Sequence, residues 1–188
     1  MRAGLLVLAI GAAMTLLGCG DARVAAPDIT TPRPPDGTHP TTYPAAGVSL
    51  QVPNSWRAEQ GTSPLVASIA SGMATVAIWR YSRTEPLPKK AKTLGAARDA
   101  LVGAARKRDR TLRISRAAVV RFHGRPALQV VGTETVGTQP RMVRSTHIFT
   151  DHSEVVVEAL APPDAFPGLQ RSVFAPLLRS LKISPIPR

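Results

Sequence analysis

Four segments rich in β-branched residues follow one another between residues 116 and 161, with only short turns between them. They read RAAVVRF (116–122), RPALQVVGTETV (125–136), RMVRSTHIFT (141–150) and EVVVEALA (154–161). The stretches HGR (123–125), GTQP (137–140) and DHS (151–153) between them hold turn-forming residues. Connections this short join antiparallel neighbours, because parallel strands need a long crossover. The pattern therefore predicts an antiparallel meander.

Two further strand signals precede the meander. VSLQV (48–52) alternates apolar and polar residues, and PNSW (53–56) follows it as a turn that returns Trp56 toward the core. LVASIAS (65–71) and MATVAIWRYS (73–82) flank Gly72 and predict a hairpin. Trp79 and Tyr81, near the end of this hairpin, are expected to cap the core, and an exposed ligand platform is the alternative.

Helical periodicity appears twice. The segment 93–108 begins at a candidate N-cap, Thr93, and ends in cations, where the helix dipole favours them. Its expected buried face consists of Leu94, Ala97, Leu101, Val102 and Ala105. A second stripe, near the C-terminus, consists of Phe166, Leu169, Val173, Phe174, Leu177, Leu178 and Leu181. Pro176 lies off this stripe and should kink or restart the helix, because it lacks a backbone donor. The expected fold is α+β: an antiparallel meander sheet flanked by two main helices.

The N-terminus reads as an export signal. Ala3 to Leu17 is an uninterrupted run of apolar and small residues after Met1-Arg2, too short for a membrane span and suited to a secretory signal. The only cysteine of the chain, Cys19, closes this run after Leu16, Leu17 and Gly18. These four residues resemble the lipobox of bacterial lipoproteins, in which the cysteine carries a diacylglycerol and becomes the first mature residue. Cleavage by the ordinary signal peptidase after Val24-Ala25-Ala26 and an uncleaved anchor are the alternatives.

The resulting division of the chain has four parts. Residues 1–18 are expected to be a lipoprotein signal peptide and 19–46 a lipidated, proline- and threonine-rich disordered tether. In this tether His39 is expected to be solvated. Residues 47–184 are expected to form one domain, and 185–188 a tail. The chain after residue 46 is long enough for one domain with a real core.

The domain resembles the PsbP-like superfamily, and in particular bacterial lipoproteins of the LpqN type. The resemblance rests on GVSLQVPNSW (47–56), GRPALQVVGT (124–133) and FAPLLRSLKI (174–183). It implies an antiparallel sheet sandwiched between helices (an α/β/α sandwich). It also implies an accessory or binding protein of the cell envelope, for which the family supplies no catalytic residues.

No catalytic constellation stands out in the sequence. His147 and His152 form the only close histidine pair, but residues five apart on a strand point to opposite faces, so no metal site is expected. His123 is expected to be a turn residue. Glu154 and Glu158 share a face yet should lie roughly 13 Å apart, too far for paired acid–base work. Nothing selects one serine as a nucleophile. Neither enzyme activity nor a cofactor is therefore expected.

The charge of the chain is strongly positive and unevenly distributed. The chain carries 24 basic and 12 acidic residues, and residues 80–125 hold 14 of the former against three of the latter. Such a surface suits anionic polymers or phospholipid headgroups. Export argues against nucleic acid as a partner. The simpler alternative is that the arginines reflect the base composition of the coding sequence and that the positive charge has no binding function. The candidate anionic-partner surface consists of Lys89, Lys90, Lys92, Arg98, Arg106, Lys107, Arg108 and Arg110.

These observations predict a lipid-anchored envelope protein without catalysis. The membrane would hold it through the N-terminal lipid, and its partner would be an envelope protein or an anionic polymer or lipid. Two other functions stay open. One is a carrier of a lipid or small apolar ligand, which would need an apolar cavity between helix and sheet. The other is a secreted hydrolase or isomerase, which would need a pocket that gathers a histidine and carboxylates.

Overall fold

The computed structural model describes residues 30–85, 87–88, 90–150 and 152–186. Several predictions fall outside the described residues: the predicted signal peptide with its lipobox residues Leu16, Leu17 and Gly18, the predicted lipidation site Cys19, and Lys89. Within the described part of the chain, no helix is long and apolar enough to cross a membrane.

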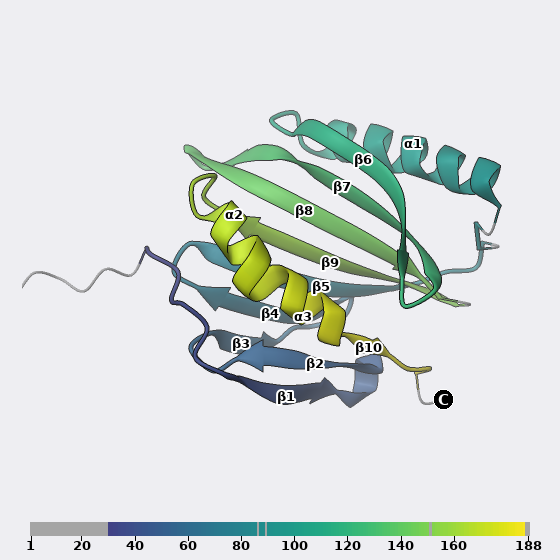
Figure 1. The fold of residues 1–188 in the computed structure, drawn as a ribbon. Helices are drawn as coiled ribbons and strands as arrows, with labels where there is room; N and C mark the ends of the chain where they lie inside the picture. The colour runs from purple at the N-terminus through teal and green to yellow at the C-terminus, as the bar shows by residue number, and fades with distance from the viewer. Residues whose placement is uncertain (1–29, 86, 89, 151, 187–188) are drawn as a thin grey trace, which may run out of the picture.

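A seven-stranded, fully antiparallel sheet forms the centre of the molecule, in the order β3-β4-β5-β9-β8-β7-β6 (Figure 1). Its strands are β3 (Arg57–Gln60), β4 (Leu65–Ser71), β5 (Ala74–Ser82), β6 (Arg113–Phe122), β7 (Arg125–Val136), β8 (Gln139–Phe149) and β9 (Ser153–Ala161). The predicted meander is confirmed as β6 to β9, and the predicted hairpin as β4 and β5. The last strand of the meander, β9, pairs with β5, so the meander and the earlier strands form one sheet.

A smaller sheet, in the order β1-β2-β10, lies beside the large one. It contains β1 (Thr38–Tyr43), β2 (Val48–Pro53) and β10 (Lys182–Ile183), with a short 3-10 turn, η1 (Pro44–Ala46), between β1 and β2. Strand β2 is the predicted VSLQV strand. Strands β1, β3 and β10 are not predicted, because they are short or carry few apolar residues.

Helices cover both faces of the large sheet. Helix α1 (Ala91–Arg108) packs on β6 and β7, whereas the C-terminal helical segment crosses the other face (Figure 1). That segment runs through α2 (Phe166–Leu169), a π-helical stretch η2 (Gln170–Phe174) and α3 (Ala175–Ser180). Pro176 lies in the first turn of α3, so the helix restarts there as expected. The α+β sandwich predicted from the sequence is confirmed.

The main core lies between the C-terminal helical segment and the two sheets. Six residues of the predicted stripe are buried, the exception being half-buried Leu178. Trp56 is 4% exposed and meets Phe174 edge-on, which confirms its predicted place in the core. A second, smaller cluster under α1 joins Leu94, Leu128 and Phe149. The face predicted for α1 points toward the sheet, although only Leu94 is fully buried.

Thr93 is not the N-cap of α1, as the sequence suggested. The helix begins at Ala91, and the Thr93 hydroxyl bonds back to the backbone N–H and carbonyl of Lys90, at 3.2 and 2.8 Å. The threonine therefore still satisfies a backbone donor at the helix start, from a position inside the first turn.

The prediction of a disordered tether was wrong for residues 30–46. All six residues of β1 pair with β2, and Tyr43 is buried. The chain before β1 is also fastened to the domain, because the Arg33 carbonyl accepts a hydrogen bond from Trp56 Nε1 at 3.1 Å and the Arg33 N–H donates to Ser71 Oγ at 2.9 Å. His39 is exposed but bonds Asn54 at 2.9 Å. A composition rich in proline and threonine was taken to indicate disorder, but these residues are also compatible with an edge strand such as β1.

Candidate functional site

The cationic residues selected from the sequence lie on and around α1, but they do not form one patch. Lys90 and Lys92 lie at its start, and Arg106, Lys107, Arg108 and Arg110 lie at or just beyond its end. At 1.5 Å per residue, Lys92 and Arg106 are separated by about 21 Å, more than twice the screening length of about 8 Å in physiological salt. Arg98, between them, pairs with Asp99 at 2.7 Å. The surface therefore consists of two separate cationic groups.

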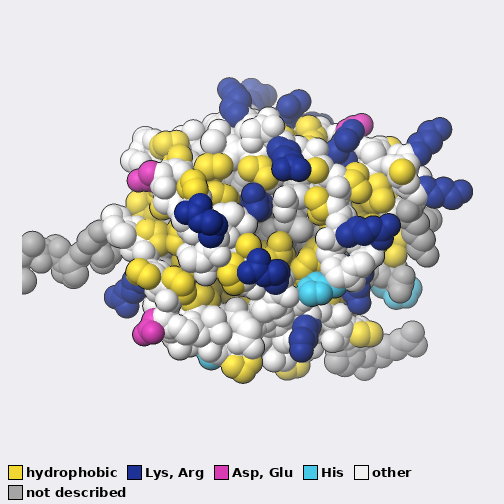
Figure 2. Space-filling view, viewed as in Figure 1, with side chains coloured by type: hydrophobic (Ala, Val, Ile, Leu, Met, Phe, Trp, Pro, Cys, Tyr) yellow, Lys and Arg dark blue, Asp and Glu magenta, His cyan; other side chains and the backbone are white. Residues whose placement is uncertain are grey.

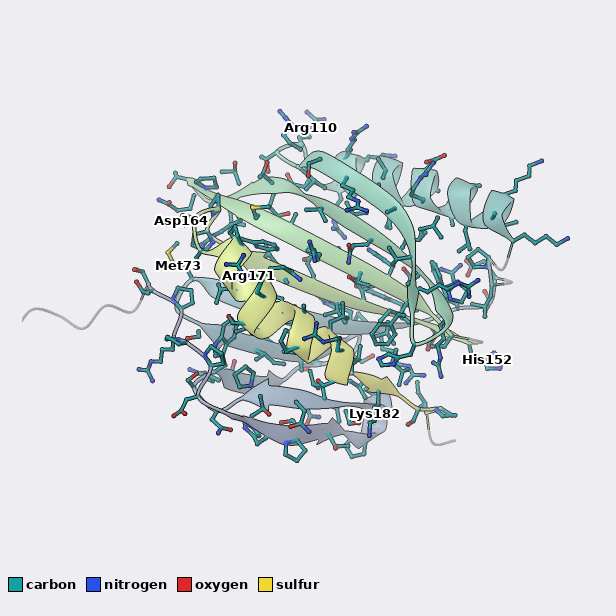
Figure 3. The ribbon with its side chains drawn as sticks, viewed as in Figure 1. Met73, Arg110, His152, Asp164, Arg171 and Lys182 are labelled. Carbon is teal, nitrogen blue, oxygen red and sulfur yellow. The ribbon has the colours of Figure 1, made fainter. Side chains whose placement is uncertain are left out.

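Other cations lie on the opposite layer of the molecule. Figure 2 shows Lys and Arg side chains scattered over the face that carries the C-terminal helical segment, with few acids among them. Arg171 and Lys182 lie on this face, whereas Arg110 lies beside the end of α1 (Figure 3). Positive charge thus lies on both layers of the molecule, and four of the cations, Arg106, Lys107, Arg108 and Arg110, lie within five residues at the end of α1.

An open cleft lies between α1 and the sheet face beneath it. Its volume is about 770 Å³, within the range of small-molecule sites. Its apolar wall includes Leu101, Leu112, Val130, Val143 and Val156, and two aromatic side chains, Trp79 and Tyr81, extend that wall along β5. Trp79 is half-buried and Tyr81 is 42% exposed, so the Tyr81 ring is available to a ligand. The ligand-platform alternative for these aromatics thus describes their setting better than a closed core cap.

The polar side of this cleft concentrates acids in a basic protein. Glu134, Glu154 and Glu158 line it, together with Asp109 and His147. The sequence correctly placed Glu154 and Glu158 on one face. Arg108, from the end of α1, lines the same cleft and offsets part of the negative charge of Glu158 and Glu134. Arg108 therefore belongs as much to the cleft as to the outer cationic group.

The carboxyl groups of the cleft differ in their pKa values because their partners differ. Burial raises the pKa of Glu158, and burial together with repulsion from Glu158 raises the pKa of Glu134. Burial alone would also raise the pKa of Glu154, but hydrogen bonds from His147 and Arg83 outweigh it and hold that pKa below its usual range. Glu154 is thus the carboxylate kept ionised, whereas Glu158 and Glu134 hold their protons more tightly.

Ser145, His147 and Glu154 form one hydrogen-bonded chain in the cleft. Ser145 Oγ lies 3.0 Å from His147 Nε2, and His147 Nδ1 lies 2.6 Å from Glu154 Oε1. Arg83 Nη1 donates to Glu154 Oε2 at 2.8 Å, and the Arg83 guanidinium lies 5.2 Å from the centre of the Phe149 ring. All three members lie on strands: Ser145 and His147 two apart on β8, and Glu154 on β9.

The spacing of these residues in the sequence already indicates part of the Ser145–His147–Glu154 network. Residues two apart on a strand share a face, which places Ser145 beside His147. The short turn after β8 pairs His147 with Val156, so Glu154 sits diagonally across from the histidine. The contact between His147 and Glu154 joins two strands, so it depends on the register between β8 and β9 and not on spacing within one strand.

His147 and His152, for which no metal site is predicted, lie in different places. His147 lines the cleft under α1, while His152 lies in the β8–β9 turn and lines a second cavity of about 830 Å³ (Figure 3). Arg80 and Arg125 line that cavity too, but Arg80 already donates to the Ala46 and Ser184 carbonyls and to Ser153 Oγ. Among the described residues, no three acid, histidine or cysteine side chains are placed to hold a metal ion.

His123 has a positive φ of 46° in the β6–β7 turn, as expected of a turn residue.

Comparison with known proteins shows the fold. Cyanobacterial PsbP (CyanoP) from Synechocystis has a similar structure, with a TM-score of 0.59 and 13% identity over 90% of this chain and 99% of that one. LpqN, a protein involved in cell envelope biogenesis in Mycobacterium tuberculosis, has a TM-score of 0.56 and 19% identity over 80% of this chain and 87% of that one. No family model and no curated protein sequence matches the chain. The protein has a PsbP-like fold.

Proposed function

We infer that the protein is exported, anchored by lipid at Cys19, and binds through its cationic groups to the anionic surface of the cell envelope. The observation that carries this inference is the pair of cationic groups at the ends of α1. Lys92, Arg106 and Lys107 are exposed, and among the described residues none of the three has an ion-pair partner. The fold shared with LpqN supports an envelope setting.

The position of the first cationic group favours a role for its charge. Lys90 and Lys92 lie at the positive end of the helix dipole, where acids stabilise a helix and cations cost about 0.3–1 kcal/mol each. The first turn holds no acidic residue to offset them. Cations that reduce helix stability at this position are explained by binding better than by base composition alone.

Vesicle binding tests the cationic groups. Residues 30–188 should bind vesicles of phosphatidylglycerol and not of phosphatidylcholine, with affinity falling steeply as salt rises. The double variants Lys90→Glu/Lys92→Glu and Arg106→Glu/Lys107→Glu should each weaken binding by about tenfold or more, since each cation near an anionic surface contributes about 1 kcal/mol. Combining them should multiply the two effects, because the groups are separated by more than the screening length.

A charge-matched variant separates a specific surface from net charge. Arg171→Glu/Lys182→Glu changes the net charge equally on the opposite layer (Figure 3) and should leave vesicle binding nearly unchanged. Equal losses in all three double variants would show that only net charge matters, and the α1 surface would be discarded.

Lipid anchoring at Cys19 has a separate test. Mass spectrometry of the mature chain from its own cells should find residue 19 at the N-terminus, with a diacylglycerol on the cysteine sulfur. Cys19→Ser should move the protein from the membrane fraction to the soluble fraction, because two or more acyl chains are needed for stable anchoring. A mature chain that begins at any other residue would remove the anchor from the proposal.

The carrier alternative fits the cleft less well. A carrier of an apolar ligand needs an apolar cavity between helix and sheet, and the cleft found there contains His147 and several acids. A pocket that gathers a histidine and carboxylates is instead what a hydrolase or isomerase requires.

A further inference from the structure

In the hydrogen-bonded chain of Ser145, His147 and Glu154, donors and acceptors can follow the order that activates a hydroxyl nucleophile. The pKa of Glu154 is held below its usual range, so its carboxylate accepts from His147 Nδ1. In the His147 tautomer that carries its proton on Nδ1, the Nε2 lone pair is directed at the Ser145 hydroxyl. Arg83 fixes the far oxygen of Glu154 at 2.8 Å. This is the order of nucleophile, base and orienting acid found in serine hydrolases of unrelated folds.

The chain also faces a space that can hold a substrate. Ser145, His147 and Glu154 all line the cleft of about 770 Å³ under α1. Trp79, Leu101 and Val156 supply apolar surface along that cleft. A small acyl group would bury its hydrocarbon against these walls with its carbonyl beside Ser145.

We propose that Ser145 is an acyl-accepting nucleophile, that His147 is its base and Glu154 a positioning residue, and that the cleft hydrolyses esters of small acyl groups. This activity goes beyond the binding role inferred above and does not depend on it.

The reaction is a two-step acyl transfer. Ser145 Oγ attacks the ester carbonyl carbon while its proton passes to His147 Nε2. The bond from that carbon to the alkoxy oxygen then breaks, and the proton on Nε2 goes to the departing alcohol. Water then attacks the acyl carbon while His147 Nε2 takes its proton. The bond from the acyl carbon to Ser145 Oγ breaks, Nε2 returns the proton to Oγ, and the carboxylic acid leaves.

Two features of the cleft limit the rate. The sheet hydrogen bonds of β8, which pairs with both β7 and β9, engage backbone N–H groups, so an oxyanion must rely on side-chain donors such as Tyr81 and Arg108 at the cleft wall. The loss of one preorganised donor typically costs about 100- to 1,000-fold in kcat. The Ser145 hydroxyl also bonds Glu158, which competes with His147 for its single proton. We therefore expect slow turnover and ready covalent trapping.

Covalent labelling with a fluorophosphonate tests the proposal on the full chain. The probe should add one phosphonyl group to the folded protein, and peptide mapping should place the group on Ser145. Ser145→Ala and His147→Gln should abolish labelling, and Glu154→Gln should slow it by about tenfold or more. Ser172→Ala, which removes an exposed hydroxyl from the C-terminal helical segment, should label like the unchanged chain.

Hydrolysis of p-nitrophenyl acetate should follow the same order of variants. Circular dichroism confirms that each variant is folded, and the mapping of the adduct in the unchanged protein decides the question even where a variant does not fold. An unlabelled wild-type chain, an adduct on another residue, or equal labelling of folded His147→Gln would overturn the proposal. The Ser145–His147–Glu154 chain would then be a purely structural hydrogen-bond network.

Discussion

Among single residues, Glu158 shows that the cleft holds a carboxyl group whose ionised form is destabilised by burial. Burial raises its pKa above the value in the unfolded chain, despite the opposing effects of Arg108, His147 and the Ser145 hydroxyl. The folded state therefore holds the proton more tightly, so stability falls as pH rises through the window between the unfolded and folded pKa values. Ionised Glu158 therefore lowers the stability of the folded state at neutral pH, and this effect disappears in acid, where the side chain is protonated.

Glu158→Gln should consequently raise the melting temperature at pH 7.5, and the gain should shrink toward pH 4, near the pKa of an unfolded glutamate. Glutamine retains an acceptor for Ser145, so the change removes charge with little loss of hydrogen bonding. Glu59→Gln provides the control, since Glu59 is exposed and pairs with Arg57 on the outer strand β3. Thermal unfolding at the two pH values measures the effect, and a lower melting temperature for Glu158→Gln at pH 7.5 would contradict it.

Individual residues were predictable where one local rule decides their place. Trp56 and His123 could be placed because a turn sequence fixed each of them. The partners of Glu154 could not be found in the same way, because they depend on the register between β8 and β9. A shift of one residue in that register would turn the glutamate away from His147.

At the scale of the element, prediction succeeded where periodicity was long. Strand β7 begins and ends at the residues expected, and the buried stripe of the C-terminal helical segment was recognised despite its change to a π-helical stretch. Strand β3 was missed, because RAEQ shows no apolar alternation and forms only through pairing with β4. Helix α1 was predicted correctly although its apolar face is short of large side chains. Leu94 is its only fully buried residue, so the cleft beside the helix stays open.

At the scale of the whole molecule, the domain boundary is the main departure from expectation. The sequence predicts a boundary before Gly47 because the preceding residues cannot build a core of their own. They instead complete a core built elsewhere: β1 covers the edge of β2, Tyr43 is buried at 7% exposure, and the Arg33 backbone joins Trp56 to Ser71. Any tether to a membrane is consequently shorter than the composition suggested.

A chain that begins at Gly47 should therefore be much less stable than one that begins at Thr30. It loses the β1–β2 ladder and the Tyr43 side chain, whose burial alone is worth about 1.5–3 kcal/mol, and it leaves the buried Trp56 Nε1 without its acceptor, at about 1–3 kcal/mol. Urea unfolding should show a clearly lower midpoint for the shorter chain, while Tyr43→Phe in the longer chain should change it little. Equal midpoints for the two chains would mean that residues 30–46 only rest on the surface, and a tether of the original length would be restored.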